Sequence, residues 1–249
     1  MAARRNGISG VAMKKLVLSA ISLLALAGCA SAPVSTMERS DSYYMSVAEG
    51  QAGETVSLFT SDESVLSSED ISNILAYRYS APAQNRIGVI ALGRTFWFGY
   101  SEELARTGTD IQTGMVAKLR SSPRVYDASY LPTLLIPEKR TVGHYREAAA
   151  RYQADLLLIY QAACRSYDKY RFFSPDEAKS YCNVEAVILD VRTGIVPFSV
   201  TASRDFMARE NKEDMNFRET MARAELKALA DALTEVGDEA VKFLARQGG

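Results

Sequence analysis

The residue types that most often carry catalysis or bind metals are scarce in this chain. There are three cysteines, Cys29, Cys164 and Cys182, and His144 is the single histidine. A zinc site needs several His, Cys or carboxylate ligands at close spacing, and a serine triad would need His144 as its base. Neither G-x-S-x-G nor G-x-x-x-x-G-K-[ST] occurs in the sequence. We therefore expect no metal site, no cofactor and no enzyme activity, with a hydrolase assembled from distant carboxylates as the remaining alternative.

Cys29 follows a short apolar segment with the layout of a secretory signal. Lys14 and Lys15 precede the apolar residues 16–27, which are too few for the roughly 20 residues of a transmembrane helix. The tetrapeptide LAGC at 26–29 resembles a bacterial lipobox, which implies that Cys29 is lipidated and becomes the first mature residue. The alternative is a cleaved signal in which Cys29 carries no lipid. Met13 is a second possible start for translation, because Met13, Lys14 and Lys15 form a compact basic start by themselves.

The lipobox resemblance also implies a location. Ala30, rather than Asp, follows the cysteine, and in Gram-negative lipoproteins this implies the outer membrane, with the domain facing the periplasm and the acyl chains supplying the membrane affinity. The predicted organisation is a signal peptide at 1–28, a flexible tether at 29–67 and a single periplasmic domain at 68–249. Surface exposure of the domain is a second possible orientation.

The charge balance excludes one class of partner. Residues 1–28 hold four basic residues and no acidic one, so the remainder has 25 basic and 30 acidic residues, a formal charge of −5. A nucleic-acid-binding protein would show a concentrated basic face, and no such run is present. We therefore expect no nucleic-acid partner.

The elements that must position any site follow from apolar periodicity. The run at 154–164 is predominantly apolar, which predicts a central strand. The weaker run at 124–131 and the Pro197-containing segment at 195–206 are expected at edges. A helix between successive strands implies parallel pairing, and a short connection implies an antiparallel hairpin. The predicted elements are strands at 86–93, 124–131, 154–164, 182–191 and 195–206, and helices at 69–77, 101–120, 141–152 and 216–246.

This pattern predicts an α/β (α+β) domain with a mixed sheet of about four to five strands, in the order β-α-β-α-β-β-α, with packed helices. The two remaining cysteines would face each other across the hairpin, because pairing Cys164 with Cys182 also places Leu158 opposite Ile188. Disulfides persist in an oxidising compartment such as the periplasm. We therefore predict a Cys164–Cys182 disulfide.

Two stretches carry a resemblance to known families. HYREAAARYQADLLLIYQA resembles the helix-to-strand step of the TolB N-terminal domain and of CsgG-like and PelC-like outer-membrane lipoproteins, and VEAVILDVRTGIV resembles their hairpin. The likeness covers roughly residues 86–246 and implies the same fold without transferring any catalytic residue. In length and layout the chain also resembles the group called rhombotarget lipoproteins.

Aromatic side chains gather in two connections, after the first strand and within 165–181. Tyr, Trp and Arg dominate protein interfaces, so we expect a protein partner in outer-membrane assembly, secretion or trafficking. Phe98 and Tyr181 are expected in the core instead. The alternative is an oligomeric, CsgG-like secretion-channel subunit, for which the 165–181 connection is short and charged on both alternating faces. The predicted partner-binding residues are Phe96, Trp97, Tyr170, Arg171, Phe172 and Phe173.

Overall fold

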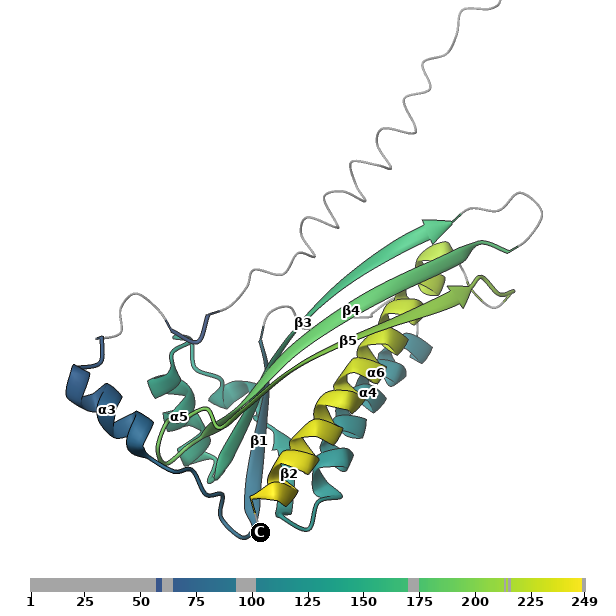
Figure 1. Cartoon of the computed structure of the whole chain (residues 1–249). Helices are drawn as coiled ribbons and strands as arrows, with labels where there is room; N and C mark the ends of the chain where they lie inside the picture. The colour runs from purple at the N-terminus through teal and green to yellow at the C-terminus, as the bar shows by residue number, and fades with distance from the viewer. Residues whose placement is uncertain are drawn as a thin grey trace, which may run out of the picture. The chain divides into compact units, whose positions relative to one another are not determined.

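The computed structural model describes residues 57–59, 65–92, 102–169, 175–212, 214 and 216–247. They form a five-stranded mixed sheet with helices packed on its two faces, which confirms the predicted fold class (Figure 1). In chain order the elements are α3 (Ser68–Ala76), β1 (Asn85–Leu92), α4 (Glu102–Arg120), β2 (Val125–Tyr130), the 3-10 helix η1 (Thr133–Leu135), α5 (Val142–Arg151), β3 (Leu156–Lys169), β4 (Glu177–Asp190), β5 (Phe198–Arg209) and α6 (Phe217–Arg246).

The strand order across the sheet is β2-β1-β3-β4-β5. β1 pairs in parallel with both β2 and β3, while β3, β4 and β5 pair antiparallel. The predictions of a central strand at 154–164 and of edge strands at 124–131 and 195–206 are therefore confirmed. The parallel strands are joined through helices, and the antiparallel strands are joined by short connections, as expected.

α4 and α6 cover one face of the sheet and build the larger core. α6 contributes an apolar seam that steps by three and four residues, as an amphipathic helix must. Gly237 lies within this seam, where an added Cβ would stand 3.1 Å from Cγ of Lys118 on α4. The glycine therefore lets the two helices approach closely, and α6 continues through it without interruption. The buried seam residues of α6 are Leu226, Leu229, Leu233, Val236, Ala240 and Leu244.

α5 covers part of the opposite face. The Thr141 side chain caps its first turn by accepting from the His144 backbone N–H, and Tyr145 is fully buried against the sheet. The helix ends at Tyr152, and Gln153 then takes a left-handed conformation with φ of 59°. This sharp turn brings the chain straight into β3.

The two stretches that carry the family resemblance meet at the start of β3. Asp155 accepts from the Arg86 backbone N–H at 2.8 Å and pairs with Arg192 at 2.5 Å. Asp190 accepts from both the N–H and the hydroxyl of Thr193 at 2.7 Å, and Gly194 closes that turn with φ of +78°. The aspartates and the turn glycine therefore fix the ends of three strands, which is a structural role.

The hairpin of β3 and β4 is longer than predicted. Its strands run to Lys169 and from Glu177, so most of the 165–181 connection is strand and not loop. Cys164 pairs with Cys182, as predicted, and Leu158 with Ile188. A disulfide joins the two cysteines, whose Cα atoms are 4.1 Å apart.

The connection from β5 to α6 is held by one acidic side chain. Asp214 accepts from Arg223 at 2.8 and 2.7 Å, from the Thr220 hydroxyl and from the Asn211 N–H. Its side chain is almost fully buried. Burial alone would raise the pKa of Asp214, but these hydrogen bonds prevail and lower it. The Asn216 side chain then caps α6.

Candidate functional site

One part of one sheet face is left uncovered by helices among the residues that the structure describes. α5 packs against Leu157, Ile159 and Leu189 on this face, whereas α4 and α6 line the opposite face (Figure 1). Beyond α5, strands β3, β4 and β5 continue with every second side chain exposed or half-buried. We call this surface the open face. Its side chains are Gln161, Ala163, Arg165, Tyr167, Lys179, Tyr181, Asn183, Glu185, Ser199, Thr201, Ser203, Asp205 and Met207.

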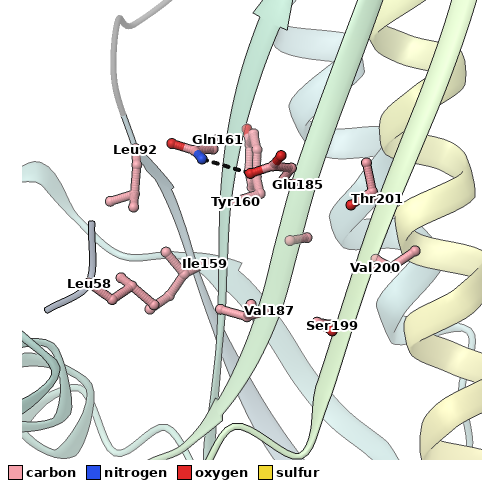
Figure 2. Close-up of a pocket in the computed structure, with 11 residues that line it drawn as sticks. Leu58, Leu92, Ile159, Tyr160, Gln161, Glu185, Val187, Ser199, Val200 and Thr201 are labelled. Carbon is pink, nitrogen blue, oxygen red and sulfur yellow. Dashed lines mark hydrogen bonds between the residues drawn. The ribbon is translucent and has the colours of Figure 1, made fainter. Parts of the chain in front are cut away.

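A depression of about 220 Å³ lies at the base of the open face. Figure 2 shows the side chain of Leu58 reaching toward Ile159, and Gln161 and Glu185 standing at the rim. Gln161 donates to the Glu185 carboxylate at 2.9 Å. A depression of this size and lining can accept one apolar side chain and offer hydrogen bonds around it. Its apolar lining is formed by Leu58, Leu92, Ile159 and Val187.

Two tyrosines dominate the far end of the open face. The rings of Tyr167 and Tyr181 pack edge to face with centroids 6.0 Å apart, although the two side chains remain 55% and 45% exposed. Lys179 Nζ lies 4.5 Å from the centroid of Tyr181 and 3.0 Å from Asp205. Hydrogen bonds to Tyr181 and then to Asp205 raise the pKa of Lys179. Tyr181 is therefore a surface residue, and its predicted place in the core is wrong.

At the far end of the open face, two of the basic side chains form ion pairs with acidic side chains of neighbouring strands. Lys179 pairs with Asp205, and Arg209 pairs with Glu177 at 3.1 Å. Arg165 is exposed beside Tyr181 and makes no ion pair within the described part of the chain. An exposed guanidinium beside two tyrosines, with Met207 on the next strand, has the composition of an interface core rather than of a plain surface.

The arrangement does not assemble catalytic chemistry from the described side chains. Nδ1 of His144 lies 2.7 Å from the Thr141 hydroxyl at the start of α5, away from the open face. Within the described ranges, no three His, Cys, Asp or Glu side chains gather closely enough to hold a metal ion. Among the described side chains, the open face offers aromatic stacking, hydrogen bonding and the Arg165 guanidinium.

The predicted partner-binding residues, Phe96, Trp97, Tyr170, Arg171, Phe172 and Phe173, lie outside the described residues, as does Cys29. The strands that lead to them are described. β1 ends at Leu92, opposite Gln161, and β3 runs eight residues further to Lys169. At about 3.3 Å per residue the two strand ends are roughly 26 Å apart. Both strands run in the same direction, as expected, but the convergence of the two aromatic segments stays a prediction.

Sequence reasoning missed the β5 part of the open face. Asp205 and Met207 alternate with the buried Ala208 and half-buried Phe206, and this period of two was the signal that could have identified a strand with one exposed face. Tyr167 belongs to the aromatic residues of 165–181, a segment that the sequence predicts to be a connection and that is partly strand β3 in the structure.

No family model matches the sequence, and no curated protein is similar to it. Solved structures with a similar arrangement include the PelC dodecamer from Paraburkholderia phytofirmans, at 16% identity over 64% of this chain and 94% of that chain, with a TM-score of 0.32. Lipoprotein GNA1162 from Neisseria meningitidis is 14% identical over 66% of this chain and 99% of that one (TM-score 0.32). A minor lipoprotein from Acinetobacter baumannii is 11% identical over 63% and 92% (TM-score 0.33). At these identities and TM-scores, the similarities assign neither a family nor a function.

None of the described helices is both long enough and apolar enough to cross a bilayer.

Proposed function

We propose that this protein is a non-enzymatic, lipid-anchored envelope protein whose periplasmic domain binds another protein through the open face. The proposal places the lipid on Cys29, the signal peptide at 1–28, the tether at 29–67 and the domain at 68–249. The lipobox supports the anchor, and the following Ala30 supports the outer membrane. The acyl chains supply the membrane affinity.

The observation that carries the binding role is the composition of the open face. Tyr167, Tyr181 and Met207 are each about half exposed on three neighbouring strands. Contiguous exposed apolar side chains on a domain often mark a protein-interaction site. Arg165 supplies a charge that an acidic group of the partner would neutralise. The surface therefore fits a protein with a small apolar contact and an acidic residue beside it.

The binding role is tested by a matched pair of tyrosine substitutions. Tyr167→Ala removes an open-face ring, and Tyr126→Ala removes a ring of similar exposure, 59%, from β2. A photo-crosslinking residue at position 163, also on the open face, reports contact in living cells. We expect a discrete crosslinked protein, lost at least tenfold on Tyr167→Ala or Arg165→Ala and retained on Tyr126→Ala. Equal yields from all variants would contradict the proposal.

The anchor is tested separately. Cys29→Ser should abolish metabolic labelling with a palmitate analogue and release the protein from the outer-membrane fraction. A wild-type protein that is soluble in the periplasm with an unmodified N-terminus would refute the lipid anchor without affecting the test of the open face.

A further inference from the structure

A leucine that precedes all the described helices and strands lies against the sheet. Leu58 belongs to the segment 29–67, which the sequence predicts to be a tether, and its side chain is half-buried against the apolar cluster between α5 and the sheet. The next side chain, Phe59, is 68% exposed, and its backbone N–H donates to the Ser57 hydroxyl at 3.1 Å. The short segment 57–59 therefore presents one apolar side chain to the domain and one to solvent.

This contact makes Leu58 one wall of the depression at the base of the open face. The strands β3, β4 and β5 contribute Ile159, Val187 and Thr201 to its lining. Figure 2 shows Leu58 on the side of Leu92, with Thr201 on the opposite side. A side chain seated in the depression would therefore touch Leu58 and the strands at once.

A single leucine holds this segment only weakly. Partial burial of the Leu58 side chain stabilises the docked segment, whereas fixing the backbone of residues 57–59 costs conformational entropy of the same order. Among the described residues, no backbone hydrogen bond joins this segment to the sheet. The docked and undocked states are therefore close in free energy, and a ligand that binds the docked state better shifts the population toward it.

The rim of the depression specifies the kind of ligand. Glu185 is exposed there, accepts from Gln161 and makes no ion pair within the described part of the chain. A carboxylate beside an apolar depression favours a ligand with a positive group. The hydroxyls of Ser199 and Thr201 add hydrogen-bonding groups on β5. The depression therefore suits a leucine-sized apolar residue with a lysine or arginine beside it.

We propose that segment 57–59 is part of the binding site, so that its docking and the binding of a partner segment with a leucine-sized residue beside a basic one stabilise each other. The proposal rests on the proposed function, in which the ligand of the open face is a protein, and adds a coupling to it. Because such a coupling is reciprocal, weakening the docking must weaken the binding. Docking also ends the free tether at residue 56 instead of 67, and so draws the bound partner toward the membrane.

Docking is tested by the distance between two nitroxide labels. In the full-length protein, extracted in mild detergent, Phe59→Cys and Ser203→Cys place labels at exposed positions on the segment and on β5. We expect a narrow short-distance component, which Leu58→Ser lowers roughly fivefold, as removal of a half-buried leucine predicts. Leu66→Ser, at a leucine that is 53% exposed, is the matched control and should leave the component unchanged. An absent narrow component, or one that Leu58→Ser does not lower, would overturn the docking.

The coupling is tested with the photo-crosslinking residue at position 163 in living cells. Leu58→Ser and Glu185→Gln should each lower the yield of crosslinked partner at least threefold. The matched changes Leu66→Ser and Glu147→Gln, the latter at an exposed carboxylate of α5, should leave the yield unchanged. Equal yields from Leu58→Ser and wild type would overturn the coupling and leave the binding function intact. A partner captured by no variant would refute the binding function and the coupling together, while the label distances alone would then decide the docking.

Discussion

Replacing either of two buried tyrosines by phenylalanine should change the stability of the protein, in opposite directions at the two positions. Tyr145 is fully buried beneath α5, and within the described structure its hydroxyl has no hydrogen-bond partner. Tyr160 is also buried, but its hydroxyl lies 3.1 Å from the hydroxyl of Tyr130. Burial raises the pKa of all three phenols, so they are neutral at physiological pH. Replacing either Tyr145 or Tyr160 by Phe removes one oxygen and preserves the ring.

The expected magnitudes follow from hydrogen-bond accounting. An unpaired buried hydroxyl costs about 1–3 kcal/mol of desolvation, which Tyr145→Phe removes. Part of this gain is offset by loss of van der Waals contacts, so we expect a stabilisation of about 1 kcal/mol. Tyr160→Phe instead leaves the Tyr130 hydroxyl unpaired in a half-buried site and should destabilise by about 1–2 kcal/mol.

Urea unfolding followed by tryptophan or circular-dichroism signal measures both variants. With a slope of about 2 kcal/mol per molar, the midpoints should move by roughly 0.5 M in opposite directions. Tyr126→Phe, at an exposed site, is the control and should leave the midpoint unchanged. If Tyr145→Phe destabilises the protein as much as Tyr160→Phe does, the Tyr145 hydroxyl has a partner and the reasoning fails.

Three further changes probe separate features. Replacing Cys164 and Cys182 together by Ala should cost about 3 kcal/mol, from the loop of 17 intervening residues; an unchanged denaturation midpoint would show that strand pairing alone holds the hairpin. Gln153→Gly should stabilise by about 0.5–1 kcal/mol, because the left-handed backbone there favours glycine, and thermal unfolding reports it. Because the fold lowers the pKa of Asp214, this carboxylate stabilises the protein above its ordinary pKa of 3.8, and the stabilisation is lost as the pH falls through the folded-state pKa. Asp214→Asn should therefore flatten the stability profile on the acid side of 3.8; an unaltered profile would assign acid sensitivity to other groups.

The sequence predicted the sheet where burial is two-sided. Residues 156–160 are continuously apolar because α6 covers one side of β3 and α5 the other, and this pattern identified the central strand. The cysteine pair fixed the register of β3 against β4, because shifting it by one residue would expose the apolar set. The helix predicted at 69–77 likewise agrees with α3 to within a residue at each end, and Ser67 caps it.

The sequence did not predict the strands beyond the disulfide, where only one side of the sheet is covered and some of the covered side chains are polar. On β3 and β4 beyond the disulfide, the side chains facing α6 include Ser166 and Ser180, whose hydroxyls bond to each other at 2.6 Å. The buried Ser180 and the half-buried Ser166 interrupt the alternation of apolar and polar residues, so the sequence of these strands resembles that of a polar loop. The exposed face on the other side of these strands was not predicted for the same reason. The exposed tyrosines could be noticed from composition, but their common orientation required the ladder.

The anchoring of β3 at its first residues has a practical consequence for altering this protein. Asp155, Arg192 and the turn at Gly194 tie the strand ends at one end of the hairpin, and the disulfide holds it midway. Length could therefore be added beyond Lys169 and before Glu177 without disturbing the tied end. Because the added residues would lie beyond the existing pairs, every side chain of the present strands would keep its face, and the added residues would continue the alternation between the two faces. The length of the β3–β4 hairpin could thus be changed at its free end while its other end stays fixed to the sheet.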